Sequence, residues 1–480
     1  MKYLLIIVLG LSPLLSYSQS VEKYFESIRN NTAELNAFFS QMPKGGDLHN
    51  HYSGSVYAET YLQYVVERNY YVNLKTFEVD SLDHSQDIIT TNNWSHFGDL
   101  DSKKLGTIKQ NLMQKWSTKD YNGVSYPCDK QFFEAFAAFG IANNNDSRLE
   151  VGLLELKKRA KKENVSYIEL MFTNVPGGSI KITDTSLGRL LAQAQSNHDE
   201  NATTALLDKM YQMLKEKNVD GAAIEYNEQF LKPMHTKLGI DDSTFTMRYQ
   251  TYVSRSADPL TLFKNVVLSF ESANRSPLVV GVNIVAPEDG EVSMRDYWLH
   301  MQIFKYCHKK YPNVKYAMHA GELTLGLVKP EELTWHINEA VRVAGANRIG
   351  HGVDMAWEQN PYDLLKYMAK NKVAIEINLY SNEFILKVKN DAHPIKLYHD
   401  FKVPMVICTD DAGILRSNLI HQYELLASRY KYITYPEIKS YVYNSIDYSF
   451  IKDEETKKKI KSQLDKRFKE FETAIISLHK

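Results

Sequence analysis

Several histidines and acidic residues of the chain are spaced in a way that could hold a metal ion. His49 and His51 are separated by one residue, and residues with this spacing in a strand point to the same side. His319 and the pair Asp410-Asp411 follow much later in the sequence. Three histidine nitrogens and one carboxylate oxygen suit Zn²⁺. The pattern therefore predicts one zinc per chain, with one of the two adjacent acids reaching the metal and the other facing a ligand.

Two further side chains near these motifs could move protons. Glu322 follows His319 in a His-Ala-Gly-Glu run, and a carboxyl that is desolvated near a cation can stay protonated and act as a general acid. A glutamate on a surface loop is the alternative. His351, between two glycines, could be a further ligand or a base that orients a water on the metal. Structural histidines at all of these positions would be the non-catalytic interpretation.

The elements that must position these residues form a repeated pattern. Short apolar runs of strand length alternate with amphipathic helical segments, which predicts a parallel sheet with right-handed crossovers. Eight such units predict a closed (β/α)₈ barrel of the TIM type, whose chemistry lies at the carboxyl ends of the strands. The predicted strands are Gly46–Tyr52, Ser166–Phe172, Thr244–Val253, Leu278–Val285, Val314–His319, Asn347–His351, Val373–Asn378 and Pro404–Thr409.

Residues 54–165, between the first and second predicted strands, exceed a minimal barrel connection. No linker rich in Pro, Gly or Ser separates them, so we expect a mostly helical insertion over the barrel mouth within a single domain of residues 19–480. Helices are predicted after the N-cap Asp258, from Pro330 to Gly345, and from Asp453 to the end of the chain.

Composition and the amino terminus indicate an exported globular protein. The 480 residues are 44% hydrophobic and 24% charged with a net charge of −1, which argues against wholesale disorder and against nucleic acid or an anionic membrane as partner. Met1–Ser18 reads as a signal peptide, so a secreted or periplasmic location is expected, with an uncleaved anchor as the alternative. The three cysteines are most simply free buried thiols, although one disulfide is open, as is a homodimer.

Taken together, these motifs resemble those of the adenosine deaminase family of metal-dependent amidohydrolases, and more closely its secreted branch, the adenosine deaminase-related growth factors. The resemblance covers most of the predicted mature chain. It rests on Met42-Pro43-Lys44, Leu48-His49-Asn50-His51, Val165–Leu170, Val280–Asn283, His319–Glu322, Arg348–Gly352, Ser381-Asn382, His393-Pro394 and Thr409-Asp410-Asp411.

The resemblance implies a role for each site residue. A single catalytic Zn²⁺ would be held by His49, His51, His319 and Asp410. Glu322 would protonate the purine ring nitrogen, His351 would position the attacking hydroxide, and Asp411 would bind the purine. The chain departs from the family at two substrate positions. Ser53 replaces an aspartate that meets the ribose, and Ala286 replaces a glycine whose N–H meets the purine.

The expected activity is therefore hydrolytic deamination of a purine nucleoside, adenosine or 2′-deoxyadenosine, with another purine as the fallback. A two-metal hydrolase of the same superfamily is one alternative, for which Glu288 is the nearest acid after the fourth strand. A secreted nucleoside-binding or signalling protein without catalysis is the other.

Overall fold

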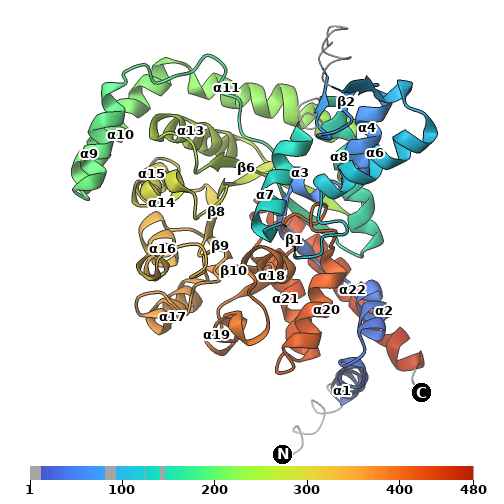
Figure 1. Ribbon diagram of the computed structural model, residues 1–480. Coiled ribbons are helices and arrows are strands. Elements are labelled where there is room, and N and C mark those ends of the chain that lie inside the picture. The colour runs from blue at the N-terminus through green and yellow to red at the C-terminus, as the bar shows by residue number, and fades with distance from the viewer. Residues whose placement is uncertain (1–11, 82–92, 125, 141–145, 479–480) are drawn as a thin grey trace, which may run out of the picture.

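The computed structural model describes residues 12–81, 93–124, 126–140 and 146–478. Within these residues, eight parallel strands follow one another in chain order around a sheet, with helices packed outside them (Figure 1). Each predicted strand is present, with ends that differ from the prediction by at most two residues. The strands are β1 (Gly46–His51), β5 (Tyr167–Met171), β6 (Thr246–Ser254), β7 (Val279–Val285), β8 (Lys315–Ala320), β9 (Arg348–His351), β10 (Ala374–Ile377) and β11 (Met405–Ile407).

The first and last strands nearly close the sheet into a barrel. A parallel bridge joins Asn50 to Asp410 just beyond the end of β11. It is built from two backbone hydrogen bonds, Asp410 N–H to His49 O at 2.9 Å and His51 N–H to Asp410 O at 3.3 Å. The predicted (β/α)₈ barrel is confirmed. The same bridge places Asp410 beside the two histidines of β1.

Helix start signals in the sequence match the start of a helix in the barrel layer. Helix α13 begins at Pro259, and the Asp258 carboxylate caps it by accepting from the N–H groups of Leu260 and Thr261. The other helices after β5 are α9 (Ser186–Ser196), α10 (Glu200–Glu216), α11 (Val219–Glu225), α12 (Lys232–Lys237), α13 (Pro259–Arg275), α14 (Glu291–Arg295), α15 (Tyr297–Lys310), α16 (His336–Glu339), α17 (Pro361–Asn371), α18 (Leu379–Leu386), α19 (Ile395–Asp400), α20 (Leu419–Arg429) and α21 (Tyr435–Asp447).

The prediction of one continuous helix from Pro330 to Gly345 is wrong. The segment from Pro330 to Gly345 consists of a 3₁₀ turn, the short helix α16 and a π turn. Trp335 interrupts it with a φ of −150°. The Glu358 carboxylate accepts hydrogen bonds from the N–H groups of Ile337 and Asn338. A residue outside the segment therefore caps the amino terminus of α16.

The insertion after β1 contains a small sheet as well as the predicted helices. Three short antiparallel strands, which the sequence analysis did not predict, lie in the order β3-β2-β4. Residues 82–92, 125 and 141–145 of the insertion lie outside the described part. Its elements are α3 (Tyr52–Ser55), α4 (Ala58–Glu67), β2 (Tyr71–Asn73), β3 (Val79–Asp80), β4 (Trp94–His96), α6 (Ser102–Lys115), α7 (Cys128–Phe139) and α8 (Asp146–Lys162).

The two ends of the described chain pack together. The amphipathic helix α22 (Glu454–Leu478) buries one face that consists of Ile460, Leu464, Phe468, Phe471 and Ile475. It contacts α1 (Ser12–Ile28), which leads into α2 (Thr32–Gln41). Residues 1–11 of the predicted signal peptide lie outside the described residues, and Ser12–Ser18 form the start of α1. Of the helices in the described ranges, none combines the length and hydrophobicity that a bilayer crossing needs. All three cysteines are buried and free, as predicted.

Candidate metal centre

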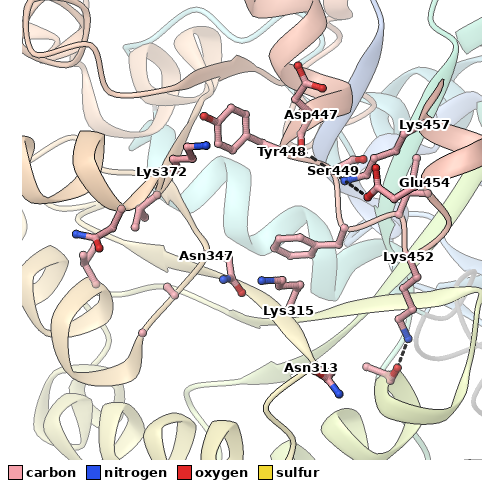
Figure 2. A pocket seen from close by; sticks show the side chains of 18 of the residues that line it. Asn313, Lys315, Asn347, Lys372, Asp447, Tyr448, Ser449, Lys452, Glu454 and Lys457 are labelled. Carbon is pink, nitrogen blue, oxygen red and sulfur yellow. Dashed lines mark hydrogen bonds and ion pairs between the residues drawn. The ribbon is translucent and has the colours of Figure 1, made fainter. Parts of the chain in front are cut away.

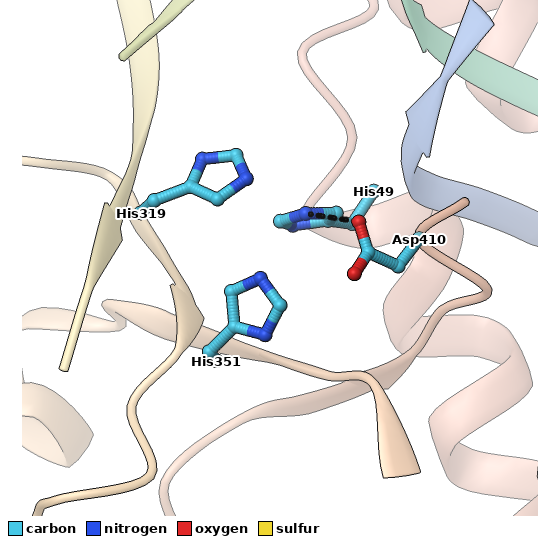
Figure 3. A group of neighbouring side chains, drawn as sticks. All are labelled: His49, His319, His351 and Asp410. Atoms are coloured by element: carbon cyan, nitrogen blue, oxygen red, sulfur yellow. Dashed lines mark ion pairs between the residues drawn. The ribbon is translucent and has the colours of Figure 1, made fainter. Parts of the chain in front are cut away.

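Three of the four predicted ligands, His49, His319 and Asp410, lie together with His351 at the carboxyl ends of the barrel strands (Figure 3). The fourth, His51, lies against His319 and Asp410. His49 and His51 come from β1, His319 from β8, and Asp410 from the turn after β11. The Nε2 atom of His51 lies 3.1 Å from Nε2 of His319 and 3.2 Å from Oδ1 of Asp410. The Nε2 atom of His49 lies 3.4 Å from the same oxygen.

These separations fit one tetrahedral zinc ion. Ligand atoms about 2.05 Å from Zn²⁺ at tetrahedral angles lie about 3.3 Å from one another. The Nε2 atom of His49 is buried and has no hydrogen-bond partner, as expected of a nitrogen whose lone pair is meant for a cation. His351 also lies within this group, since its ring nitrogen is within 4.8 Å of ligand atoms of His49, His319 and Asp410. His351 is thus close enough to contact a water or substrate atom at a metal ion that these ligands would hold.

The remote atoms of three ligands are fixed by buried partners. Nδ1 of His49 donates to Glu376 at 2.7 Å, and Nδ1 of His319 donates to the Asn283 amide oxygen at 3.0 Å. The Ser381 hydroxyl donates to Oδ2 of Asp410 at 2.5 Å. Each bond leaves the other nitrogen of the histidine, or the other oxygen of Asp410, facing the other ligands. It thereby fixes the tautomer and orientation of each histidine ring, as metal sites require.

Glu376 belongs to a buried ion network that the sequence analysis missed. Arg348 donates to Glu376 at 2.5 Å and to Glu169 at 2.6 Å, and all three side chains are fully buried. Burial alone would raise the pKa of Glu376, but Arg348 and His49 lower it to about 2. The only sequence signal was a glutamate in the middle of an apolar strand, at a position with no predicted partner.

Above the cluster lies a cavity of about 390 Å³ that collects the predicted substrate-side residues. Its walls are mainly apolar, with three phenylalanines of α7 opposite the histidines, so the insertion covers the barrel mouth as predicted. The lining is His51, Ser53, Phe132, Phe133, Phe136, Met171, Tyr252, Val285, Ala286, Pro287, His319, Glu322, His351, Asp410 and Asp411.

Glu322 lies in this cavity and not on an exposed loop. Burial, and then the Asp410 carboxylate, raise the pKa of Glu322 well above its usual range, which favours the protonated carboxyl. Its Oε1 atom lies 3.6 Å from Nδ1 of His351. Asp411 is buried in the same cavity, its Oδ1 atom has no partner, and burial with Asp410 raises its pKa as well.

Glu288, the acid considered for a second metal, has a structural role. Its carboxylate accepts the backbone N–H of Gly321 at 3.1 Å and of Glu322 at 2.9 Å, and it pairs with His336 at 2.6 Å. It is absent from the lining of the cavity among the described residues. Glu288 therefore orients the loop that carries the candidate acid Glu322, and the two-metal interpretation loses its nearest ligand.

A chain of hydrogen bonds fixes the tautomer of His351. The backbone N–H of Ile395 donates to Nδ1 of His393 at 3.1 Å, so the proton of His393 sits on Nε2, which donates to the Asn382 oxygen at 3.1 Å. The Asn382 NH₂ then donates to Nδ1 of His351 at 2.9 Å. Burial lowers the pKa of His351 to about 3, so the neutral ring carries its proton on Nε2. His351 is therefore set as a donor toward the site.

Reversing this tautomer should slow the reaction. In Asn382→Asp the new carboxylate would accept a hydrogen bond from an N–H at Nδ1 of His351. The neutral ring would then carry its proton on Nδ1 and have none on Nε2. We expect kcat to fall about a hundredfold with zinc content unchanged, because a wrong histidine tautomer disables catalysis without moving the ring. Asn390→Asp, on the exposed surface, is the matched control. An unchanged kcat in Asn382→Asp would contradict the assignment.

The backbone is strained at three positions of the site. His351, Asp410 and Ala286 adopt φ values of 70°, 61° and 86°, in the left-handed region that side chains with a Cβ disfavour. Such strain persists where the surrounding structure over-determines the conformation, and it gathers at functional sites.

Comparison with known proteins finds a family model that is similar to the part of the chain that carries most of this site. Residues 234–467, which contain His319, Glu322, His351 and Asp410, match the adenosine deaminase family model. Over this segment the chain is similar to the adenosine deaminase family. No comparison supports the secreted growth-factor branch in particular.

Curated relatives match only part of their length. An adenosine deaminase from Aliivibrio fischeri is 35% identical over 118 residues, which cover 24% of this chain and 34% of that protein. A human N6-methyl-AMP deaminase is 31% identical over 109 residues, covering 22% and 30%. The chain thus spans about a third of the length of these relatives.

Solved structures resemble the whole barrel. An adenine deaminase from Arthrobacter aurescens has a TM-score of 0.55 at 16% identity, covering 89% of this chain and 99% of that one. An amidohydrolase from Burkholderia ambifaria with bound Zn has a TM-score of 0.53 at 17% identity, covering 92% and 94%. At these identities the likeness concerns the fold.

The left-handed conformation of Ala286 explains the glycine expected at this position in adenosine deaminases. Glycine adopts a φ of 86° without cost, whereas alanine places a Cβ beside the cavity. Ala286 and Ser53 both line the cavity, and their contact with a substrate stays a prediction.

Proposed function

We propose that the protein is a zinc-dependent hydrolase that deaminates a purine nucleoside, adenosine or 2′-deoxyadenosine, releasing the inosine form and ammonia. The observation that carries the proposal is one cavity that is lined both by His51, His319 and Asp410 of the ligand cluster and by the carboxyl of Glu322, whose pKa is raised.

Each catalytic side chain has a part in this reaction. Zn²⁺, when bound by the cluster, supplies a water whose pKa is lowered to about 7. Glu322 gives its proton to the ring nitrogen next to the amino-bearing carbon, which offsets the charge that builds up as water adds there. His351 donates from Nε2 to the attacking oxygen and orients it. Asp411 offers its unpartnered Oδ1 atom to the purine.

The lining of the cavity favours a substrate without phosphate. Among its described residues there is no lysine or arginine, although phosphate recognition normally depends on such side chains. The three phenylalanines of α7 instead offer an apolar roof that suits a neutral nucleoside. This distinguishes the proposed substrate from that of the relative whose name is N6-methyl-AMP deaminase.

Zinc-loaded protein assayed on a panel of purines tests the proposal. Adenosine and 2′-deoxyadenosine should show the ultraviolet shift of deamination, and AMP and N6-methyl-AMP should react at least about a hundredfold more slowly in kcat/KM, because their phosphate has no cation to meet in the cavity. Ammonia release confirms the shift. Turnover of free adenine alone would move the proposal to a base deaminase, and no turnover of any purine would favour a nucleoside-binding protein.

The branch and the location belong to the same proposal. We infer an exported protein close to the adenosine deaminase-related growth factors from the signal-like Met1–Ser18 and the long insertion after the first strand. Mass spectrometry of the protein recovered from its source should find a mature amino terminus near Gln19; an intact Met1 in soluble cytosolic protein would contradict export.

A further inference from the structure

A large cavity of about 780 Å³ opens at the end of the barrel opposite the metal cluster (Figure 2). It lies between the amino-terminal starts of β8, β9 and β10 and the connection from α21 to α22. We call it the basal cavity. The strands are parallel, so their starts and their metal-bearing ends face opposite sides of the molecule.

The basal cavity has an excess of positive charge. Lys315, Lys372 and Lys452 line it, and within the described part of the chain none of these ammonium groups forms an ion pair with a carboxylate. The two acids of its wall have their own partners, since Asp447 pairs with Lys461 at 2.8 Å and Glu454 lies 3.9 Å from Lys457. The whole chain has a net charge of −1, so this excess is local.

An oriented amide adds hydrogen-bond donors to the same space. Oδ1 of Asn347 accepts the backbone N–H of Tyr316 at 3.1 Å, which fixes the orientation of the amide. Its NH₂ group has no partner among the described residues. Figure 2 shows Asn347 beside Lys315 on one wall, with Lys372 and Tyr448 on another.

The walls of the basal cavity are held from behind by the buried core. Arg348 donates to the Tyr448 carbonyl at 2.9 Å, and the N–H of Phe450 donates to Glu169 at 2.7 Å. Lys452 donates to the carbonyls of Ser276, at 2.6 Å, and Ala273. These bonds fix the wall of the cavity from Tyr448 to Lys452, so this part of the site has its geometry before a ligand binds.

We propose that the basal cavity binds a small molecule through a phosphate group. The Lys452 ammonium is already bound to two carbonyls, which leaves those of Lys315 and Lys372 for a ligand. Together with the oriented NH₂ of Asn347 they suit an anion with several acceptor oxygens and more than one negative charge. The volume leaves room beyond the phosphate for a ring, which Tyr367 and Tyr448 could contact. An open cavity of this size on a nearly neutral chain fits a metabolite better than a nucleic acid. This site is independent of the proposed deaminase activity.

Isothermal titration of the zinc-loaded full chain with inorganic phosphate and with phenyl phosphate tests the proposal. We expect saturable one-to-one binding of both, with phenyl phosphate tighter because its ring meets the two tyrosines. The double variant Lys315→Met/Lys372→Met should weaken binding by about tenfold or more. The matched control is Lys103→Met/Lys469→Met, which removes two exposed lysines outside the cavity and should bind as the parent does.

The site is separable from the metal centre. Metal-free protein and the Glu322→Gln variant should bind phenyl phosphate with the same affinity as the parent protein, and failure of deamination would leave this result untouched. Absence of saturable binding up to about 20 mM, or equal binding by the two double variants, would overturn the proposal. Thermal melting of each variant checks that both remain folded.

Discussion

The Glu322→Gln variant is expected to keep its zinc and to lose turnover, with kcat reduced by about 10³-fold or more. Glutamine has the shape of the protonated acid, so the loop held by Glu288 and the ligand His319 should not move. It has no proton of suitable acidity to give to the ring nitrogen, and charge then accumulates on the purine as water adds. Steady-state kinetics on adenosine together with metal analysis measure both effects.

Glu331→Gln provides the control for this variant. Glu331 is exposed, comes shortly after the same strand, and does not line the cavity, so its substitution should leave kcat within about twofold. If Glu322→Gln retained more than a tenth of the parental kcat with full metal occupancy, Glu322 would not be the acid. If it lost the metal, the experiment would report on zinc binding, and Glu322→Asp would then separate the roles.

The Glu376→Ala variant should have the largest effect on stability. Removing this carboxylate leaves the fully buried Arg348 with Glu169 as its one acid partner among the described residues. Loss of one partner from a buried ion network costs about 3–5 kcal/mol. The same change removes the acceptor for Nδ1 of His49, so zinc affinity should fall by about 10- to 100-fold. Denaturant unfolding of the metal-free protein and competition with a chelator measure the two losses separately.

Metal-free and metal-loaded proteins should respond differently to this substitution. In metal-free protein, the loss of unfolding free energy measures the contribution of the ion network. In zinc-loaded protein, any additional loss measures the weaker zinc binding by His49. Glu331→Ala, at an exposed position, should change neither quantity by more than about 0.5 kcal/mol. A stable Glu376→Ala protein with parental zinc affinity would show that the network neither supports the fold nor orients the ligand.

The sequence by itself determined the architecture and the ligand types. Eight apolar runs alternating with amphipathic segments were enough to place every barrel strand, because burial on both faces leaves a continuous apolar run that can be read locally. The alternation of His49 and His51 and the strand-end positions of His319 and Asp410 predicted a shared centre, because parallel strands end at the same face. The structure brings these side chains together.

Only the tertiary structure decided which groups support that centre. Glu376 meets His49 across 327 positions of sequence, and the proton position on His351 depends on His393 and Asn382, whose motifs were visible but whose contacts were not. The interrupted segment at Trp335 likewise follows from a carboxylate more than twenty residues away. Local patterns specify backbone conformation and burial, whereas hydrogen-bond partners, tautomers and cavities depend on which distant side chains the closed barrel brings within about 3 Å.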